Sequence, residues 1–201
     1  MKLPFYGTKE LNLKPDKIFN YFDQDFLSKI EYKIIKNELI AENLLEPKGV
    51  YGYFLCEKQG TWLVVYGEDK KELVRFDFGK TSKIFESIGD RICFFAVTAG
   101  AKIGAKEKEL KDRGEYVQYF CYHGIAIRFA EAIAEYMSSY IAMELGLDNP
   151  CRRYSFGYPN CPCLSFQKDL FKLLSPERVG MELTERFMMA PEASVSAFVV
   201  L

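Results

Sequence analysis

The stretch VYGYFLCEKQGTWLVVYGEDKKELVRFDF, residues 50–78, decides the fold class. Two β-favouring runs, 50–56 and 62–66, are separated by a turn that contains Gly60, and a third run, 73–78, alternates apolar and polar residues. Short apolar runs joined by glycine-containing turns predict an antiparallel hairpin and a following strand. RICFFAVT, 91–98, is the most apolar run, and we expect it at the centre of the sheet.

Helical patterns flank these strands. Residues 14–44 repeat apolar side chains at near-3.6-residue spacing and predict one helical stretch. The strongest helix is expected over 117–145, after a polar connection at 104–118, with Gly146 as its C-cap. Its apolar stripe consists of Ala126, Ile127, Ala130, Ile133, Ala134, Met137, Ile141 and Leu145.

In the last third of the chain, the predicted helices and strands are short. We expect a helix over 165–174, a further helix start at Ser175–Pro176, a strand around 181–189 and a terminal strand in ASVSAFVVL, 193–201. Helices and antiparallel strands are mixed without a βαβ rhythm. The sequence therefore predicts an α+β fold, an antiparallel β-sheet flanked by helices.

Composition limits the classes of function. The 201 residues, 49% of them hydrophobic, fit one compact unit, which we divide into an N-terminal helical arm, 1–43, and a main domain, 44–201. A net charge of −1 shows no basic surface for nucleic acid or anionic lipid. Neither a run of ~18 apolar residues nor the apolar segment of a signal peptide is present. We expect a cytoplasmic protein with no nucleic-acid or membrane partner.

The cysteine and histidine content argues against metal chemistry. In a chain without a signal peptide, six cysteines predict reduced thiols. Cys151, Cys161 and Cys163 form the only cluster, but C-x9-C-x-C matches no common zinc or iron–sulfur spacing, and we expect a tight turn around Pro162. The sole histidine, His123, excludes zinc-hydrolase motifs and histidine-based triads. A redox or metal protein that uses these cysteines stays open as a third class.

Residues 151–163, CRRYSFGYPNCPC, have the composition of a small-ligand clamp. Arg153 offers a planar fork suited to a carboxylate, and Tyr158 offers a ring and a hydroxyl. Gly157 between them permits a close backbone approach or a positive φ angle. The alternative is a structural loop whose aromatic side chains fill the core and whose arginine pairs with a nearby acid.

Glu131 is a second candidate, because it stands at the flank of the long helix's apolar stripe, one turn from Glu135. A carboxylate in that position can contact a ligand at the helix edge. The alternative is a half-solvated carboxylate paired with Arg128, three residues earlier.

Three motifs in order carry a family resemblance. RYSFGYPNCP, 153–162, fits R-x-x-x-G-Y-P-x-C-P; GMELTE, 180–185, fits G-[MIV]-x-L-T-E; and PEASVSA, 191–197, fits P-x-A-S-V-S-[AG]. Together with LEPKGVYGYF, DRICFFAVTAG and RFAEAIAEYM, they resemble the reactivation domain of cobalamin-dependent methionine synthase. The likeness covers about residues 44–201.

The resemblance implies a twisted antiparallel sheet with a shallow groove for S-adenosylmethionine. When the cobalamin of such an enzyme is oxidised to cob(II)alamin, an electron arrives from a flavodoxin or ferredoxin-like donor, and S-adenosylmethionine methylates the reduced cobalt. The domain holds no cobalamin itself and presents one carried by a cobalamin-binding methionine synthase chain. It is an accessory module that we do not expect to turn over alone.

The resemblance also assigns residues. Arg153 matches the arginine that holds the methionine carboxylate, and Gly157 and Tyr158 match the glycine–tyrosine pair beside the ligand. Glu131 matches a helix carboxylate near the ligand, and Asp23 matches an aspartate that meets the amino group. The charges agree, because one arginine and two carboxylates answer the carboxylate, ammonium and sulfonium of S-adenosylmethionine. No catalytic residue and no metal ligand is expected.

Two departures shape the functional hypotheses. Family domains continue beyond the A-S-V-S strand and supply a further ligand-contacting tyrosine, whereas this sequence stops at Leu201, which predicts a more open site. Family domains also end a long polypeptide, so we expect a free-standing reactivation module that acts on a separate chain. The rival hypothesis is a docking or gating partner of a corrinoid methyltransferase that does not bind S-adenosylmethionine productively.

Overall fold

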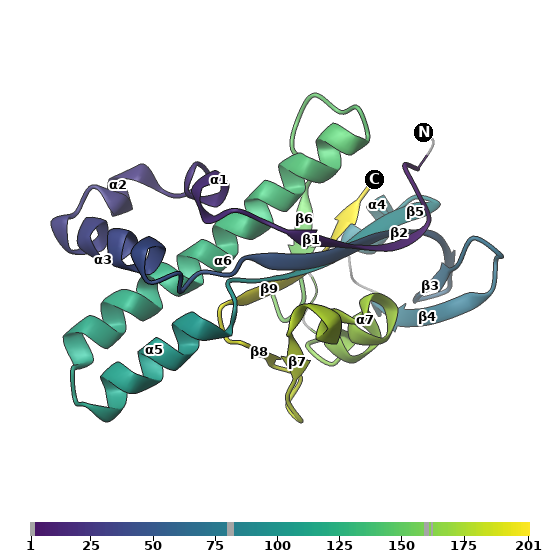
Figure 1. Ribbon diagram of the computed structural model, residues 1–201. Helices are drawn as coiled ribbons and strands as arrows, with labels where there is room; N and C mark the ends of the chain where they lie inside the picture. The colour runs from purple at the N-terminus through teal and green to yellow at the C-terminus, as the bar shows by residue number, and fades with distance from the viewer. Residues whose placement is uncertain (1–2, 80–82, 159–160, 162) are drawn as a thin grey trace.

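A seven-stranded antiparallel sheet is the centre of the computed structural model, which describes residues 3–79, 83–158, 161 and 163–201 (Figure 1). Six strands follow one another across the sheet in the order β4 (Glu72–Asp77), β3 (Trp62–Tyr66), β2 (Lys48–Gln59), β5 (Arg91–Thr98), β9 (Ser194–Val200) and β6 (Arg153–Ser155). The seventh, β1 (Gly7–Asn12), pairs with the first half of β2. The predicted hairpin, its following strand, the central strand 91–98 and the terminal strand are confirmed.

Helices cover both faces of the sheet. One face carries α1 (Pro15–Phe19), α2 (Gln24–Leu27), α3 (Ile30–Ala41), α5 (Ala101–Asp112) and α6 (Tyr116–Glu144). The other carries α4 (Lys83–Ser87), α7 (Phe166–Leu174) and a 3-10 turn at Pro176–Val179. Figure 1 shows α3, α5 and the first half of α6 extending beyond one end of the sheet. The predicted α+β class is confirmed.

Strand β5 contributes side chains to two hydrophobic clusters, one on each face of the sheet. Cys93, Phe95 and Val97 face the α6 side, whereas the alternate residues Ile92 and Phe94 face the α7 side. All five are 0–1% exposed. Because successive side chains of a strand point to opposite faces, a sheet buried on both sides needs an unbroken apolar run. RICFFAVT is such a run, and β2 and β9 flank it.

Helix α6 packs along the sheet through the expected stripe. Ala126, Ala130, Ile133, Ala134, Met137 and Ile141 are buried, and three of them are alanines, whose small side chains let the helix approach the strands closely. Near the helix end, the Glu144 carboxylate accepts hydrogen bonds from the Tyr51 and Tyr53 hydroxyls at 2.9 and 3.0 Å. The cap residue is Leu145, and Gly146 follows at φ +69°, which ends the helix as predicted.

The region before residue 44 differs from the single helical stretch that periodicity predicted. It forms three helices, because Asp23 caps α2 by accepting from the backbone N–H groups of Asp25 and Phe26, and Lys29 adopts an extended conformation before α3. The strand β1 precedes them and was not predicted. Its sequence, GTKELN, is polar because the strand lies at an edge and is only partly buried.

Two further segments correct the sequence prediction. The polar connection at 104–118 is largely helix α5, which buries only Ile103, Glu107 and Leu110. Most of its other positions hold lysine, alanine or glutamate, which are good helix formers. The strand expected around 181–189 is a two-stranded ribbon, β7 (Glu182–Leu183) and β8 (Met189–Ala190). Among the described residues, no helix has the length and apolar character needed to cross a lipid bilayer.

The pairing of β1 with β2 predicts a steric effect at Gly52. A methyl group there would overlap the carbonyl oxygen of Gly7 and lie 2.9 Å from the Phe54 ring. Gly52→Ala should therefore reduce the free energy of unfolding by about 1–3 kcal/mol, as overpacking does. In α6, a methyl at Gly124 meets nothing within 4 Å, so Gly124→Ala should stabilise by up to ~1 kcal/mol. Urea unfolding compares the two; a neutral Gly52→Ala would contradict the β1–β2 packing.

Candidate ligand-binding site

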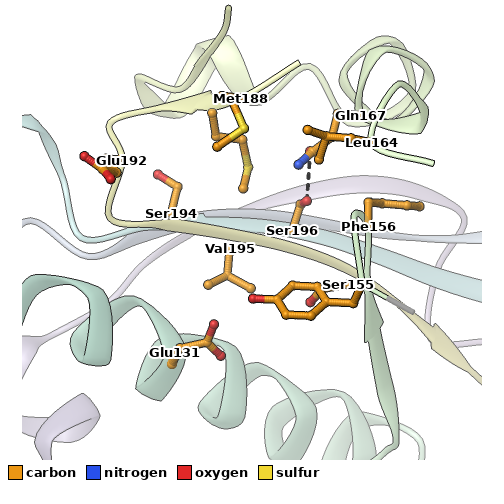
Figure 2. A pocket seen from close by; sticks show the side chains of 12 residues that line it. Glu131, Ser155, Phe156, Leu164, Gln167, Met188, Glu192, Ser194, Val195 and Ser196 are labelled. Atoms are coloured by element: carbon orange, nitrogen blue, oxygen red, sulfur yellow. Dashed lines mark hydrogen bonds between the residues drawn. The ribbon is translucent and has the colours of Figure 1, made fainter. Parts of the chain in front are cut away.

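The candidate site lies along the part of strand β9 that does not pair with the outer strand β6. Strand β5 pairs with β9 over 194–200, but β6 pairs with it only over 197–199. Beyond Ser155 the chain leaves the sheet, and Gly157 turns it with φ +84°. A pocket that is partly open to solvent occupies the uncovered edge (Figure 2). Its lining is Glu131, Ser155, Phe156, Tyr158, Leu164, Gln167, Met188, Met189, Glu192, Ser194, Val195 and Ser196.

The pocket receives side chains from both layers of the fold. Figure 2 shows Glu131 rising from α6 on one side of β9, while Gln167 and Met188 lie on the other side. Ser196 Oγ donates a 2.9 Å hydrogen bond to Gln167 Oε1, and both residues are buried. Sequence reasoning missed Gln167, whose position on the buried face of α7 looks like part of the core. The pocket combines an apolar wall with a few fixed polar groups, as small-ligand sites do.

A second pocket adjoins the first and contains the arginine. It is lined by Glu131, Arg153, Tyr154, Ser155 and Tyr158, three of which also line the first pocket. We call the two pockets together the edge groove. The structure thus brings Arg153, Tyr158 and Glu131 into one groove, from the strand β6, the loop after it and helix α6.

Arg153 spans the gap between strand and helix. Its Nη2 donates to Glu131 Oε2 at 2.8 Å and to Glu135 Oε1 at 2.9 Å, and its Nε donates to Glu135 Oε1 at 3.3 Å. The arginine side chain is 19% exposed, whereas the two carboxylates are 46% and 55% exposed. Burial lowers the pKa of Arg153, but the hydrogen bonds to Glu135 and Glu131 outweigh that effect and raise the pKa overall. The guanidinium is a permanent charge at the groove.

Glu131 does not pair with Arg128, contrary to the alternative considered from the sequence. Arg128 instead stacks on the Phe26 ring at 4.1 Å and lies 4.0 Å from Asp23. The alternative considered for residues 151–163 was an arginine that pairs with a nearby acid. In the structure Arg153 forms such ion pairs. The sequence does not show that the acids are Glu131 and Glu135, because they lie on α6, 22 and 18 positions before the arginine.

Gly157 and Tyr158 form the turn beside the groove. The Gly157 N–H donates to the Cys161 carbonyl, and the Cys161 N–H donates to the Tyr158 carbonyl, both at 2.8 Å. The positive φ at Gly157 is one of the two roles expected of it, and a Cβ there would lie 3.1 Å from Leu164. Tyr158 is 60% exposed, so its ring is available at the groove. The turn expected around Pro162 lies outside the described residues.

Asp23 lies apart from this group. It lines neither pocket of the edge groove, and its carboxylate caps helix α2. Through the contact with Arg128 it approaches α6 one turn before Glu131. The structure therefore brings four of the five predicted residues to the groove or its rim and leaves Asp23 on the neighbouring helix.

The cysteines form no disulfide bonds among the described residues. All six are free thiols. Burial, together with the neighbouring Cys163, raises the pKa of the Cys161 thiol to about 12. Within the residues that the structure describes, histidine, cysteine and acidic side chains form no group of three or more that could hold a metal ion.

Fold and groove together define an α+β domain with a candidate ligand site at the edge of its sheet. The family model for the vitamin B12-dependent methionine synthase activation domain matches residues 31–201, and the chain belongs to this family. It is 30% identical over 190 residues to the methionine synthases of Mycobacterium tuberculosis and Mycobacterium leprae, and the match covers 75% of this chain. The chain spans 16% of the length of these relatives.

A solved structure agrees in fold. The crystal structure of the MetH reactivation domain bound to AdoHcy matches with a TM-score of 0.79 and 21% sequence identity, covering 100% of this chain and 81% of that one. The predicted recognition and the predicted fold are both confirmed by these comparisons.

The buried pair in the groove yields a prediction. Ser196→Ala leaves the Gln167 oxygen without its donor and should reduce the free energy of unfolding by about 1–2 kcal/mol. Combining it with Gln167→Leu removes the unpaired group, so the double variant should lose less than the sum of the single variants. Urea unfolding of the four proteins measures this coupling. Strictly additive losses would show that the hydrogen bond contributes nothing.

Proposed function

We propose that this chain binds S-adenosylmethionine in the edge groove and serves the reductive reactivation of a cobalamin-dependent methionine synthase. The observation that carries the proposal is Arg153 held against Glu131 at the mouth of a pocket with an apolar wall. Family membership supports it. The AdoHcy bound in the similar structure supports it too, since that molecule is S-adenosylmethionine without its methyl group.

The charges of the groove complement those of the ligand. S-adenosylmethionine carries a carboxylate, an ammonium and a sulfonium. In this proposal, the guanidinium of Arg153 binds the carboxylate, and Glu131, which now accepts from Arg153 Nη2, binds the ammonium. Tyr158 flanks the ligand, and Gly157 sets the turn that carries the tyrosine. We retain Asp23 as a further partner of the amino group, because Arg128 connects it to the helix of Glu131.

The remaining pocket suits the adenosine end. Phe156, Leu164 and Met188 supply apolar surface, and the Gln167 amide supplies polar atoms. A groove that is partly open to solvent lets one end of the ligand stay accessible to a second protein. We therefore assign to this chain the binding and orientation of the methyl donor.

The reaction itself needs a partner. The partner protein carries cob(II)alamin, which accepts one electron from a flavodoxin or ferredoxin-like donor; the methyl group of S-adenosylmethionine then passes to cobalt, and S-adenosylhomocysteine leaves. No side chain of the edge groove has to exchange a proton for this transfer. The chain thus acts as an accessory module of a methyltransferase that works in the cytoplasm.

A docking or gating partner without productive ligand binding is the second candidate. The specific observation that favours it is the engagement of Arg153 by two carboxylates, with which a ligand carboxylate must compete. Binding of S-adenosylmethionine separates the two candidates.

Replacement of Arg153 tests the site. Arg153→Ala should weaken S-adenosylmethionine binding by about 2–4 kcal/mol, since a charge-assisted contact is lost. Arg153→Lys should restore little, because an ammonium cannot reproduce the fork. The matched control is Arg152→Ala, whose exposed side chain lies over the Tyr154 ring at 5.9 Å and lines neither pocket. Calorimetric titration measures all four proteins, and circular dichroism establishes that they are folded.

Two results would contradict the proposal. Equal affinity in the wild type and both alanine variants would place binding elsewhere, and no binding by the folded wild type would leave the docking candidate. The reactivation role has its own test. An oxidised cobalamin methionine synthase that lacks its activation domain should regain activity with this chain, S-adenosylmethionine and a chemical reductant. It should not regain activity with Arg153→Ala in place of the wild type.

A further inference from the structure

The two carboxylates on Arg153 occupy different positions relative to the groove. Glu131 lines both of its pockets, whereas Glu135, one helical turn further along α6, lines neither. Glu131 makes one hydrogen bond to the arginine, at 2.8 Å. Glu135 receives two, from Nε and Nη2, and so holds one edge of the guanidinium.

We propose that Glu135 is a positioning residue, which keeps the Arg153 guanidinium in place while the amino-acid end of S-adenosylmethionine inserts between Arg153 and Glu131. This inference rests on the proposed function and assigns separate tasks to the two carboxylates. Glu131 exchanges its partner, from the guanidinium to the ligand ammonium. Glu135 keeps its partner.

The charges support this order. Before binding, one guanidinium and two carboxylates give the cluster a net charge of −1. After insertion, the charged groups lie in the order Glu135, Arg153, ligand carboxylate, ligand ammonium and Glu131. Every charge in this row has a neighbour of opposite sign. The sulfonium adds one positive charge and neutralises the net −1. A zwitterion that enters this ion pair therefore leaves no group unpaired, which limits the cost of breaking the Arg153–Glu131 contact.

The backbone positions make Glu135 suitable for holding the arginine. It belongs to a 29-residue helix whose neighbouring positions Ala132, Ala134 and Met137 are buried, so its Cα is fixed relative to the sheet. Arg153 is fixed in the same frame, because β6 pairs it with Val199. The ion pair joins two rigid elements at the rim, outside the path of the ligand.

This role differs from a contribution to stability. Glu135 is 55% exposed, and exposed ion pairs contribute little to the free energy of unfolding. Without Glu135, Arg153 keeps only the contact that the ligand must break. Its long side chain must then be ordered at the moment of binding, a cost that corresponds to about two- to tenfold in affinity.

The test compares two ligands. S-adenosylmethionine has the amino-acid end, and 5′-methylthioadenosine has the same adenosine and sulfur without it. Glu135→Ala should raise the Kd for S-adenosylmethionine about two- to tenfold and leave the Kd for methylthioadenosine unchanged. Glu135→Gln should recover part of the loss, because the amide oxygen still accepts from Arg153. Asp148→Ala is the control, since it removes one exposed negative charge, five positions before β6 in the sequence, from a residue that forms no ion pair with a described residue.

A second measurement needs no ligand. The Arg153 Nε–H, which donates to Glu135, should give a protected resonance in the NMR spectrum of the wild type and exchange faster with water in Glu135→Ala. Unchanged exchange, or unchanged affinity for S-adenosylmethionine, would overturn the positioning role and leave the proposed function intact. Equal weakening of both ligands together with a lower melting temperature would show a structural role instead. A wild type that binds methylthioadenosine but not S-adenosylmethionine would overturn both proposals.

Discussion

The unequal pairing of strand β9 is the constraint on which the candidate site depends. All seven of its residues pair with β5, but the three-residue strand β6 covers only the second half of its outer edge. The uncovered half, residues 194–196, becomes one side of the pocket. Because β6 must end for the groove to exist, the turn at Gly157 belongs to the site as much as the side chains do.

Helix α6 links this edge to the core. Its alanine-rich face packs on the sheet, and the same helical register places Glu131 and Glu135 at the rim, four residues apart and facing Arg153. Two carboxylates on successive turns repel each other unless a cation lies between them. The arginine of β6 supplies that cation, so the positions of the outer strand and the helix are coupled through charges that remain partly in water.

Sequence periodicity predicted what depends on local pattern, and it missed what depends on pairing across the fold. The central strand 91–98 and the long helix could be predicted, since a run buried on both faces and a long apolar stripe are visible in the residues themselves. Strand β1 and helix α5 could not, because their sequences are polar and only contacts with β2 and α6 identify them. Within the site, the residue chemistry singled out Arg153, Tyr158 and Glu131 as candidates, and the family motifs assigned their roles. Glu135 and Gln167 were missed, because only the tertiary arrangement shows that one meets Arg153 and the other meets Ser196.

The most direct test of this account is a crystal structure of the protein with S-adenosylmethionine. The account predicts the ligand carboxylate within hydrogen-bonding distance of the Arg153 guanidinium, roughly 2.7–3.2 Å. It also predicts the ligand ammonium beside Glu131 and the Glu135–Arg153 contact unchanged. A ligand whose amino-acid end lies away from Arg153, with the Arg153–Glu131 ion pair still closed, would contradict it.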